Sequence, residues 1–235
     1  MSAEAAARKG IPDATVSRLP TYLRALTALT VSGTTVVSSD ELSALVGVGS
    51  AKLRKDLSHL GTYGVRGVGY DVERLTGEIS LALGLTREWP VAIIGMGNLG
   101  RALAAYGGFA NRGFTVIAAF DRDPTLVGAI ESGIPVRPMA DLAAVVRAEG
   151  LAIGVIATSP EGAQEAADAL VSAGVRAILN FASTVITTPS TVTVRGVDLA
   201  TELQILAFHA LRRAAPLAAV DAGSPAGGPA AVSAS

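Results

Sequence analysis

Three glycines, Gly95, Gly97 and Gly100, directly follow an apolar run and constrain the fold of this chain more than any other feature. The run, Val91–Ile94, is short and preceded by Trp89-Pro90, which is typical of a buried strand. The residues after the loop, Leu99–Asn111, have the pattern of a helix. A strand, a glycine-rich turn and a helix in this order form the opening unit of a parallel α/β sheet.

The following residues alternate between strand and helix patterns. We expect strands at Phe114–Phe120, Ala152–Ala157, Ala177–Phe181 and Val192–Val197, and helices at Ala140–Glu149, Glu161–Ala173 and Leu199–Arg213. Apolar strands that alternate with helices are buried on both faces of a sheet. The pattern predicts a Rossmann-type, doubly wound parallel sheet over residues 86–200. The last helix, placed at residues 201–215, keeps an apolar face suited to a partner surface.

The glycine loop has the sequence context of a dinucleotide site. Gly95 permits a tight turn, Gly97 lets the backbone approach a pyrophosphate, and Gly100 lets the helix pack on the sheet. Asp121 ends the next strand, where a carboxylate accepts hydrogen bonds from the adenosine ribose and favours NAD(H) over NADP(H); its neighbour Arg122 weakens that preference. The expected cofactor contacts are Gly95, Met96, Gly97, Asn98, Leu99, Gly100, Asp121, Arg122, Thr158, Ser159 and Pro160.

Two plainer interpretations stay open for these segments. The glycines can serve only to turn the chain tightly between a strand and a helix. Ser159-Pro160 can serve only as the start of a helix, because proline is favoured in the first helical turn.

Residues 18–85 predict a winged helix-turn-helix. A helix from Leu19 to about Ser32 precedes a capping cluster, Ser38–Glu41, which opens a second helix. A glycine turn then leads to a third helix, Ser50–Leu60, and a glycine-rich ribbon, Val65–Val72. The flanking segments 1–17 and 216–235 are small and polar, and we expect a flexible arm and a disordered tail.

The third helix and the ribbon carry a local basic excess in a chain whose net charge is −1. Such an excess is what contacts to DNA phosphates require. The expected DNA contacts are Ser50, Lys52, Arg54, Lys55, Ser58, Arg66, Gly67, Gly69 and Tyr70. The alternative is a solvated charged face without a partner.

Composition excludes several kinds of site. The chain has no cysteine, and its two histidines are far apart, so thiol chemistry and a metal site are not expected. The longest charge-free run, 177–194, is interrupted by Asn180 and Pro189, and no secretory signal opens the chain, so we expect a cytoplasmic protein away from membranes. His209, the only histidine after the glycine loop, lies among apolar residues. Few residues could therefore act as the proton donor or acceptor that a nicotinamide dehydrogenase needs. This favours a role for the bound dinucleotide as a signal rather than as a reactant.

Several segments resemble the Rex family of redox-sensing transcriptional repressors. The resemblance extends over about residues 11–213 and is carried by Leu53-Arg54-Lys55-Asp56-Leu57, Gly61–Tyr70, Arg18-Leu19-Pro20, Tyr22-Leu23-Arg24, Gly95–Gly100, Tyr106–Phe109 and Val197-Asp198-Leu199. It implies a homodimer that exchanges its C-terminal helix, binds a palindromic operator in double-stranded DNA, and is released by NADH, whereas NAD⁺ competes weakly and permits binding.

The resemblance also implies a switch made of Arg24, Tyr106 near the nicotinamide, and Asp198 of the partner subunit. Leu199 departs from the pattern, because some members place an aromatic residue there. Two alternatives are a small NAD-dependent oxidoreductase with a helical N-terminal dimerisation domain, and a DNA-binding protein whose Rossmann domain only dimerises. An oxidoreductase would consume NADH in the presence of a carbonyl substrate, and we expect no enzyme activity.

Overall fold

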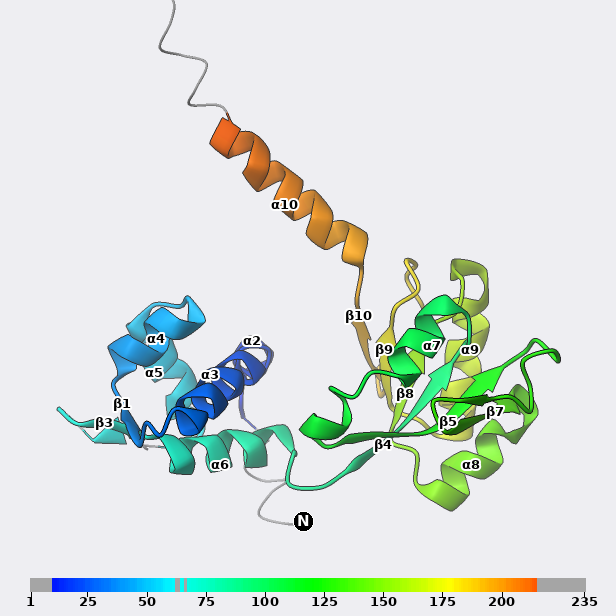
Figure 1. Ribbon diagram of the computed structural model, residues 1–235, viewed down its shortest axis with the longest axis horizontal. Helices are drawn as coiled ribbons and strands as arrows, with labels where there is room; N and C mark the ends of the chain where they lie inside the picture. The colour runs from blue at the N-terminus through cyan, green and yellow to red at the C-terminus, as the bar shows by residue number, and fades with distance from the viewer. Residues whose placement is uncertain (1–9, 62–63, 66, 215–235) are drawn as a thin grey trace, which may run out of the picture.

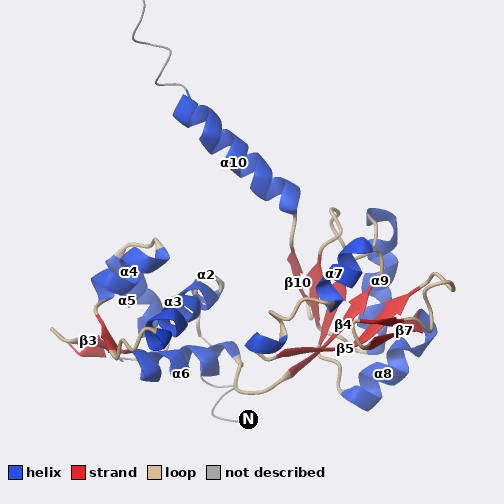
Figure 2. Cartoon of the chain, viewed as in Figure 1, coloured by secondary structure: helices blue, strands red, loops and turns tan. Residues whose placement is uncertain are grey.

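The computed structural model describes residues 10–61, 64–65 and 67–214, which form two bodies and a projecting helix (Figure 1). The N-terminal body is mainly helical, and the second body is built on a larger sheet (Figure 2). Most of the expected arm, residues 1–9, and the expected tail, 216–235, lie outside the described residues. In the described part of the chain, no helix combines the length and apolar character needed to cross a membrane.

The N-terminal body is a helix-turn-helix with a small antiparallel sheet, as expected. Its elements are α2 (Asp13–Val16), α3 (Leu19–Val31), β1 (Val36–Val37), α4 (Ser39–Val46), α5 (Ser50–Ser58), β2 (Gly64–Val65), β3 (Gly69–Asp71) and α6 (Val72–Leu83). The strand order is β1-β3-β2. Ser38 and Glu41 form a capping box at the start of α4, and Gly47 ends that helix with a φ of 69°.

Two local expectations for this body are wrong. Helix α2 lies inside the stretch 1–17 that we expected to be a flexible arm, and Thr15 in α2 is buried. Its short polar sequence carries too weak a periodicity to predict it. The third helix ends at Ser58 rather than at Leu60, because the chain tightens into a turn before Gly61.

The second body is a seven-stranded sheet in the order β10-β9-β8-β4-β5-β7-β6, and its pairs are parallel except for β6 with β7. The elements are β4 (Trp89–Ile94), α7 (Asn98–Ala104), β5 (Phe114–Asp121), β6 (Ile130–Glu131), β7 (Ile134–Pro138), α8 (Leu142–Glu149), β8 (Ile153–Ile156), α9 (Pro160–Ala173), β9 (Ala177–Asn180) and β10 (Thr193–Gly196). This order confirms the doubly wound sheet, with its topological switch point between β4 and β8.

Strand β4 contributes to a separate core on each face of the sheet. Ala92 and Ile94 pack in the cluster that includes residues of α8 and α9. Val91 and Ile93 pack in the cluster that includes Leu103 of α7. Because β4 is buried on both faces, its C-terminal end and the glycine loop after it are held by both cores.

The helix expected over Leu99–Asn111 is shorter than we predicted. Helix α7 ends at Ala104, and a short 3-10 helix, Ala110–Arg112, follows after a turn. Gly107 and Gly108 lie in that turn. Glycine disfavours a helix interior, which explains the early end.

Helix α10 (Leu199–Ala214) leaves the second body after β10 and projects away from both bodies (Figure 1). It begins at Leu199, as the helix pattern predicted, and therefore just inside the range 86–200 that we assigned to the sheet domain. Leu203, Leu206 and Leu211 are 66%, 63% and 73% exposed. The described part of a single chain therefore leaves this apolar surface uncovered.

Candidate functional site

The glycine loop joins β4 to α7, and its backbone packs closely against neighbouring backbone atoms. Gly95 has a φ of 96°, and a Cβ there would lie 2.9 Å from the carbonyl oxygen of Ala157. A Cβ on Gly100 would overlap the carbonyl oxygen of Gly95. Gly97, the N-cap of α7, has open space on its Cβ side. Two of the glycines are thus required by packing, and Gly97 leaves room for a ligand.

A cavity lies beside this loop, at the C-terminal ends of β4, β5 and β8. It brings together six of the predicted cofactor residues, namely Gly95, Gly97, Asp121, Arg122, Thr158 and Ser159, with Ile94, Met139, Ala157, Gly162, Glu165, Ala166 and Ala169. Ligands of doubly wound sheets bind at this position, outside the strand ends at the switch point. The sequence patterns did not indicate Glu165 or the apolar lining from α9, because helix periodicity does not tell which face meets the cavity.

The other predicted cofactor residues lie around the cavity rather than in it. Met96 and Gly100 are buried, whereas Asn98 and Leu99 are exposed on the first turn of α7. Pro160 is the first residue of α9.

Asp121 is held against the loop by two backbone amides. Met96 N donates to Asp121 Oδ2 over 2.6 Å, and Asp123 N donates to Asp121 Oδ1 over 2.8 Å. Arg122 Nη1 lies 3.9 Å from Glu165 Oε2 across the cavity. The carboxylate of Asp121 is therefore oriented before any ligand arrives.

The three residues of the implied switch lie on separate elements. Arg24 is exposed on α3 and lines a shallow groove with Ala25 and Leu45. Tyr106 is half exposed and packs edge-on against Phe109, with ring centroids 5.1 Å apart. Asp198 accepts hydrogen bonds from Ala200 N and Thr201 Oγ1 at the start of α10. Within one chain the structure does not bring Arg24, Tyr106 and Asp198 into contact.

Helix α5 presents a basic face to solvent. Lys52, Arg54, Lys55 and Ser58 are exposed, and Ser50 at its start is partly buried. Arg54 Nη1 donates to Ser39 Oγ over 3.3 Å, which connects α5 to the start of α4. The predicted helix contacts to DNA therefore share one accessible surface.

The wing, which consists of β2, β3 and the turn between them, is described only in part. Gly67 and Gly69 have φ values of 83° and 112°, which side chains rarely adopt. Arg66 lies outside the described residues. Tyr70 departs from our expectation of a DNA contact, because its side chain is 7% exposed and belongs to the N-terminal core, although it also borders a hollow beside Arg54. A strand residue next to a glycine turn can face either side, and here it faces inward.

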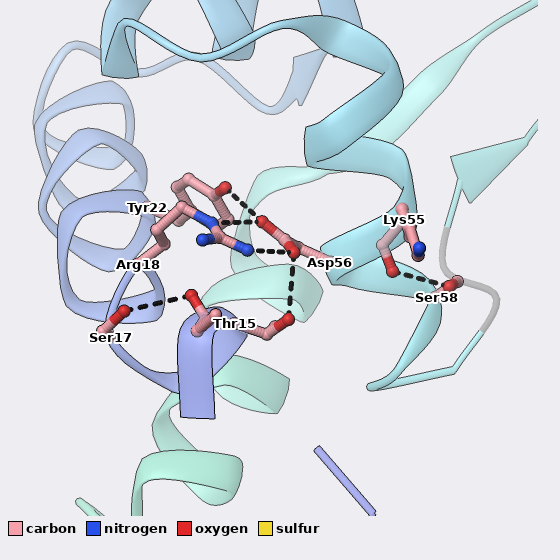
Figure 3. Close-up of polar contacts among 8 residues, drawn as sticks. Thr15, Ser17, Arg18, Tyr22, Lys55, Asp56 and Ser58 are labelled. Carbon is pink, nitrogen blue, oxygen red and sulfur yellow. Dashed lines mark hydrogen bonds and ion pairs between the residues drawn. The ribbon is translucent and has the colours of Figure 1, made fainter. Parts of the chain in front are cut away.

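Asp56 forms a buried polar cluster on the opposite side of α5 (Figure 3). Arg18 holds its carboxylate with two hydrogen bonds, from Nε at 2.7 Å and from Nη2 at 2.6 Å. Tyr22 Oη donates to it over 2.7 Å, and Thr15 Oγ1 over 3.0 Å. From the sequence, Asp56 counted only as a negative charge within a basic segment.

The cluster shifts the pKa of each acid it contains. The hydrogen bonds from Arg18 outweigh burial and lower the pKa of Asp56 to about 2. Burial, followed by the hydrogen bond to Asp56, raises the pKa of Tyr22 to about 12. Both groups therefore keep their protonation states across the physiological range.

Family models match each body separately. The family described as putative DNA-binding protein N-terminus matches residues 10–58, and the family described as CoA binding domain matches residues 86–184. These matches agree with a DNA-binding domain followed by a nucleotide-binding domain.

Similar proteins and structures cover most of the chain. The redox-sensing transcriptional repressor Rex of Streptomyces coelicolor is 58% identical over 217 residues, which are 92% of this chain and 84% of that protein. Rex of Desulfitobacterium hafniense is 46% identical over 85% of this chain and 95% of its own length. The crystal structure of RSP in complex with β-NAD⁺ and operator DNA has a TM-score of 0.82 at 33% identity, covering 87% of this chain and 94% of RSP. The RSP complex with β-NADH has a TM-score of 0.80 at 32% identity, covering 88% and 97%. The chain belongs to the Rex family of redox-sensing transcriptional repressors.

Proposed function

We propose that this chain represses transcription as a homodimer on operator DNA and leaves the DNA when NADH occupies the glycine-loop cavity. The observation that carries this proposal is the presence, in one chain, of an exposed basic helix and a dinucleotide cavity that share no residue. A ligand in the cavity then acts on DNA binding through a change of arrangement rather than by competition. RSP has been crystallised with β-NAD⁺ and operator DNA, and also with β-NADH, which supports both forms of the dinucleotide as ligands of the cavity in this chain.

The cavity offers complementary chemistry to each part of a dinucleotide. The amides at the start of α7 and the open side of Gly97 suit the pyrophosphate. The remaining lone pairs of Asp121 suit the adenosine ribose, and Met139 and Ala166 offer apolar surface to an adenine ring. NAD⁺ carries a pyridinium charge that NADH lacks, so a carboxylate near the nicotinamide can distinguish them. Asp198, with Arg24 and Tyr106, is the proposed reader of that charge.

The basic face of α5 is the proposed DNA-reading surface. Lys52, Arg54 and Lys55 would contact phosphates and base edges in the major groove, with Ser50 and Ser58 beside them, and the wing residues Arg66, Gly67 and Gly69 would follow the adjacent groove. A dimer places two such helices on half-sites one or more helical turns apart, so the operator is palindromic. A protein that binds DNA and a cellular dinucleotide would act in the cytoplasm.

Helix α10 supports a second copy of the chain as the partner. Its apolar side chains are exposed in the single chain, and an exchanged helix would bury them. Exchange would also carry Asp198, at the start of α10, toward the other subunit. That arrangement accounts for the separation of Asp198 from Arg24 within one chain.

The test is DNA binding at fixed salt with each dinucleotide. An operator duplex is first selected from random-sequence DNA with the purified protein, and its binding is followed by fluorescence anisotropy. NADH should lower the affinity about tenfold or more, a coupling of about 1.4 kcal/mol, whereas NAD⁺ should lower it less. Equal effects of NADH and NAD⁺ would overturn the proposal. Consumption of NADH with carbonyl substrates would instead support the oxidoreductase alternative.

A further inference from the structure

Asp56 is the only acidic residue of α5, and it points away from the basic face (Figure 3). It is 3% exposed, whereas Lys52 and Lys55 on the same helix are exposed. A carboxylate at this place lowers the positive charge of a DNA-binding helix and must be desolvated to be buried. Neither effect favours DNA binding by itself, so its position calls for another role.

The partners of this carboxylate come from the segments that precede α5. Thr15 lies in α2, Arg18 is the N-cap of α3, and Tyr22 lies one turn further along α3. Arg18 donates from two nitrogens, one to each carboxylate oxygen. One residue of α5 is therefore fixed at a single point to both α2 and α3.

Directional bonds restrict α5 in a way that its apolar contacts do not. Leu53 and Leu57 are buried against the N-terminal core on the same side of α5. Apolar packing is non-directional, so it allows small rotations and slides of a helix. A forked arginine–carboxylate pair adds geometric specificity. The cluster thereby fixes both the rotation of α5 about its axis and its position along that axis.

We propose that Asp56 is a positioning residue for DNA recognition, which holds α5 on α3 in the one register where its basic side chains meet operator bases. This inference rests on the proposed function as a DNA-binding repressor. Non-specific binding depends on the charge that a protein brings to the phosphates, whereas sequence-specific binding requires each side chain to meet a base edge in the correct geometry. Loss of the cluster should therefore weaken operator binding and leave non-specific binding unchanged.

Two substitutions with opposite charge changes provide the test. Asp56→Asn removes a negative charge, and Arg18→Gln removes a positive charge. If the cluster acted through its electric field, the first would strengthen binding to every duplex and the second would weaken it. Positioning predicts that both variants lose about tenfold or more in operator affinity. Affinity for a scrambled duplex should stay within about twofold of the wild type at the same salt concentration.

A matched control separates positioning from general loss of stability. Arg137→Gln breaks the ion pair between Arg137 and Glu149, 3.1 Å apart, in the second body. This variant should keep the wild-type ratio of operator to scrambled-duplex affinity. NADH affinity should be unchanged in Asp56→Asn and in Arg18→Gln, because the cavity lies in the other body. All measurements are made at a temperature where circular dichroism shows each variant folded.

The outcomes distinguish this proposal from the function on which it rests. If the wild type does not prefer its selected operator over the scrambled duplex, the proposed function fails. If the wild type has this preference and both variants retain it, or Arg137→Gln also loses it, positioning by Asp56 is overturned. Tyr22→Phe removes one hydrogen bond and keeps the ion pair, so it serves if Asp56→Asn does not fold. In Tyr22→Phe, a fall in the ratio of operator to scrambled-duplex affinity, smaller than the tenfold loss expected for Asp56→Asn, supports the proposal. An unchanged ratio overturns it.

Discussion

The backbone amide of Met96 donates to the carboxylate of Asp121 over 2.6 Å, which ties the glycine loop after β4 to the end of β5. The bond sets the side of the cavity where an adenosine ribose would lie. Asp121 would then have two tasks, because the side chain that shapes the loop would also offer acceptors to the proposed ligand.

Replacing Asp121 should weaken nucleotide binding through both tasks. In Asp121→Ala we expect NADH affinity to fall about tenfold or more, because hydrogen bonds to a charged group contribute about 1.5–3 kcal/mol each. Isothermal titration calorimetry with NADH measures this change. Asp141 is an exposed carboxylate just before α8, and the variant Asp141→Asn is the control. It should bind NADH as the wild type does. An unaltered affinity in Asp121→Ala would exclude Asp121 from the site.

Gly97 and Gly100 should respond differently to the same substitution. Gly100→Ala brings a methyl group against the Gly95 carbonyl, so we expect a loss of about 1–3 kcal/mol or more in the free energy of unfolding. Gly97→Ala meets open space, so the protein should fold normally but bind NADH more weakly where the pyrophosphate approaches. Urea denaturation and NADH titration give the two quantities. Normal NADH binding by folded Gly97→Ala would argue against the phosphate position.

The Asp56 cluster predicts an acid-dependent contribution to stability. The folded pKa of Asp56 is about 2, and the pKa of an unfolded aspartate is about 3.9. Because the folded value is lower, the stabilisation is complete above about pH 5 and is lost as the pH falls toward 2. Asp56→Asn should therefore destabilise the protein more at pH 7 than near pH 2, by about 2 kcal/mol. Urea denaturation of both proteins across this range checks it, and a pH-independent difference would contradict it.

The salt dependence of DNA binding should report contacts from α5. Lys55→Ala removes one exposed cation, so the slope of log affinity against log salt concentration should become less steep by about 0.9 if Lys55 contacts a phosphate. Arg147→Ala removes an exposed cation from α8 and should leave the slope unchanged. Equal slopes for all three proteins would place Lys55 outside the interface.

An acidic substitution on α10 should disrupt the proposed dimer. Leu206 is 63% exposed in the single chain. In Leu206→Glu the buried charge would oppose helix exchange, so we expect a monomer by sedimentation at concentrations where the wild type is a dimer. Operator affinity should fall with it, because one half-site is read at a time. Gln204→Glu, which adds the same charge to an exposed polar position of α10, serves as the comparison. A dimeric Leu206→Glu would move the subunit interface elsewhere.

The sheet and the glycine loop were predictable because both depend on local patterns. Apolar runs with helices between them predicted a parallel, doubly wound sheet, and the glycines marked the end of β4. The β6–β7 hairpin was not predicted, although its turn holds Ser132 and Gly133, both with positive φ. Strand β6 has only two residues, and β7 contains Pro135 and Pro138, so neither segment has a clear strand pattern.

Helix α6 was not predicted either, although its sequence carries the signals of a helix. Asp71 caps its start, Gly84 follows its end, and Leu75 and Ile79 recur at helical spacing. The expected ribbon ended at Val72, where α6 begins, and residues 73–85 were left without a predicted element.

The Asp56 cluster depends on pairing between segments, which a single sequence does not specify. An acid beside Leu57 and three residues after Leu53 lies on the apolar side of α5, and such a place requires a partner. Arg18 and Tyr22, four residues apart, were suitable candidates. Their contact with Asp56 follows from the angle between α3 and α5, and only the folded structure gives that angle.

Among the residues that the structure describes, none covers the apolar side chains of α10, so the stability of this helix would depend on how much of the protein a cell makes. Newly made chains would mix freely before they pair. A variant chain with an intact α10 but a defective α5 would then form mixed dimers with wild-type chains. Each mixed dimer would have only one competent recognition helix, so the wild-type subunit in it would be inactivated. Expression of such a copy beside the normal gene should switch on the repressed genes even in an oxidised cell.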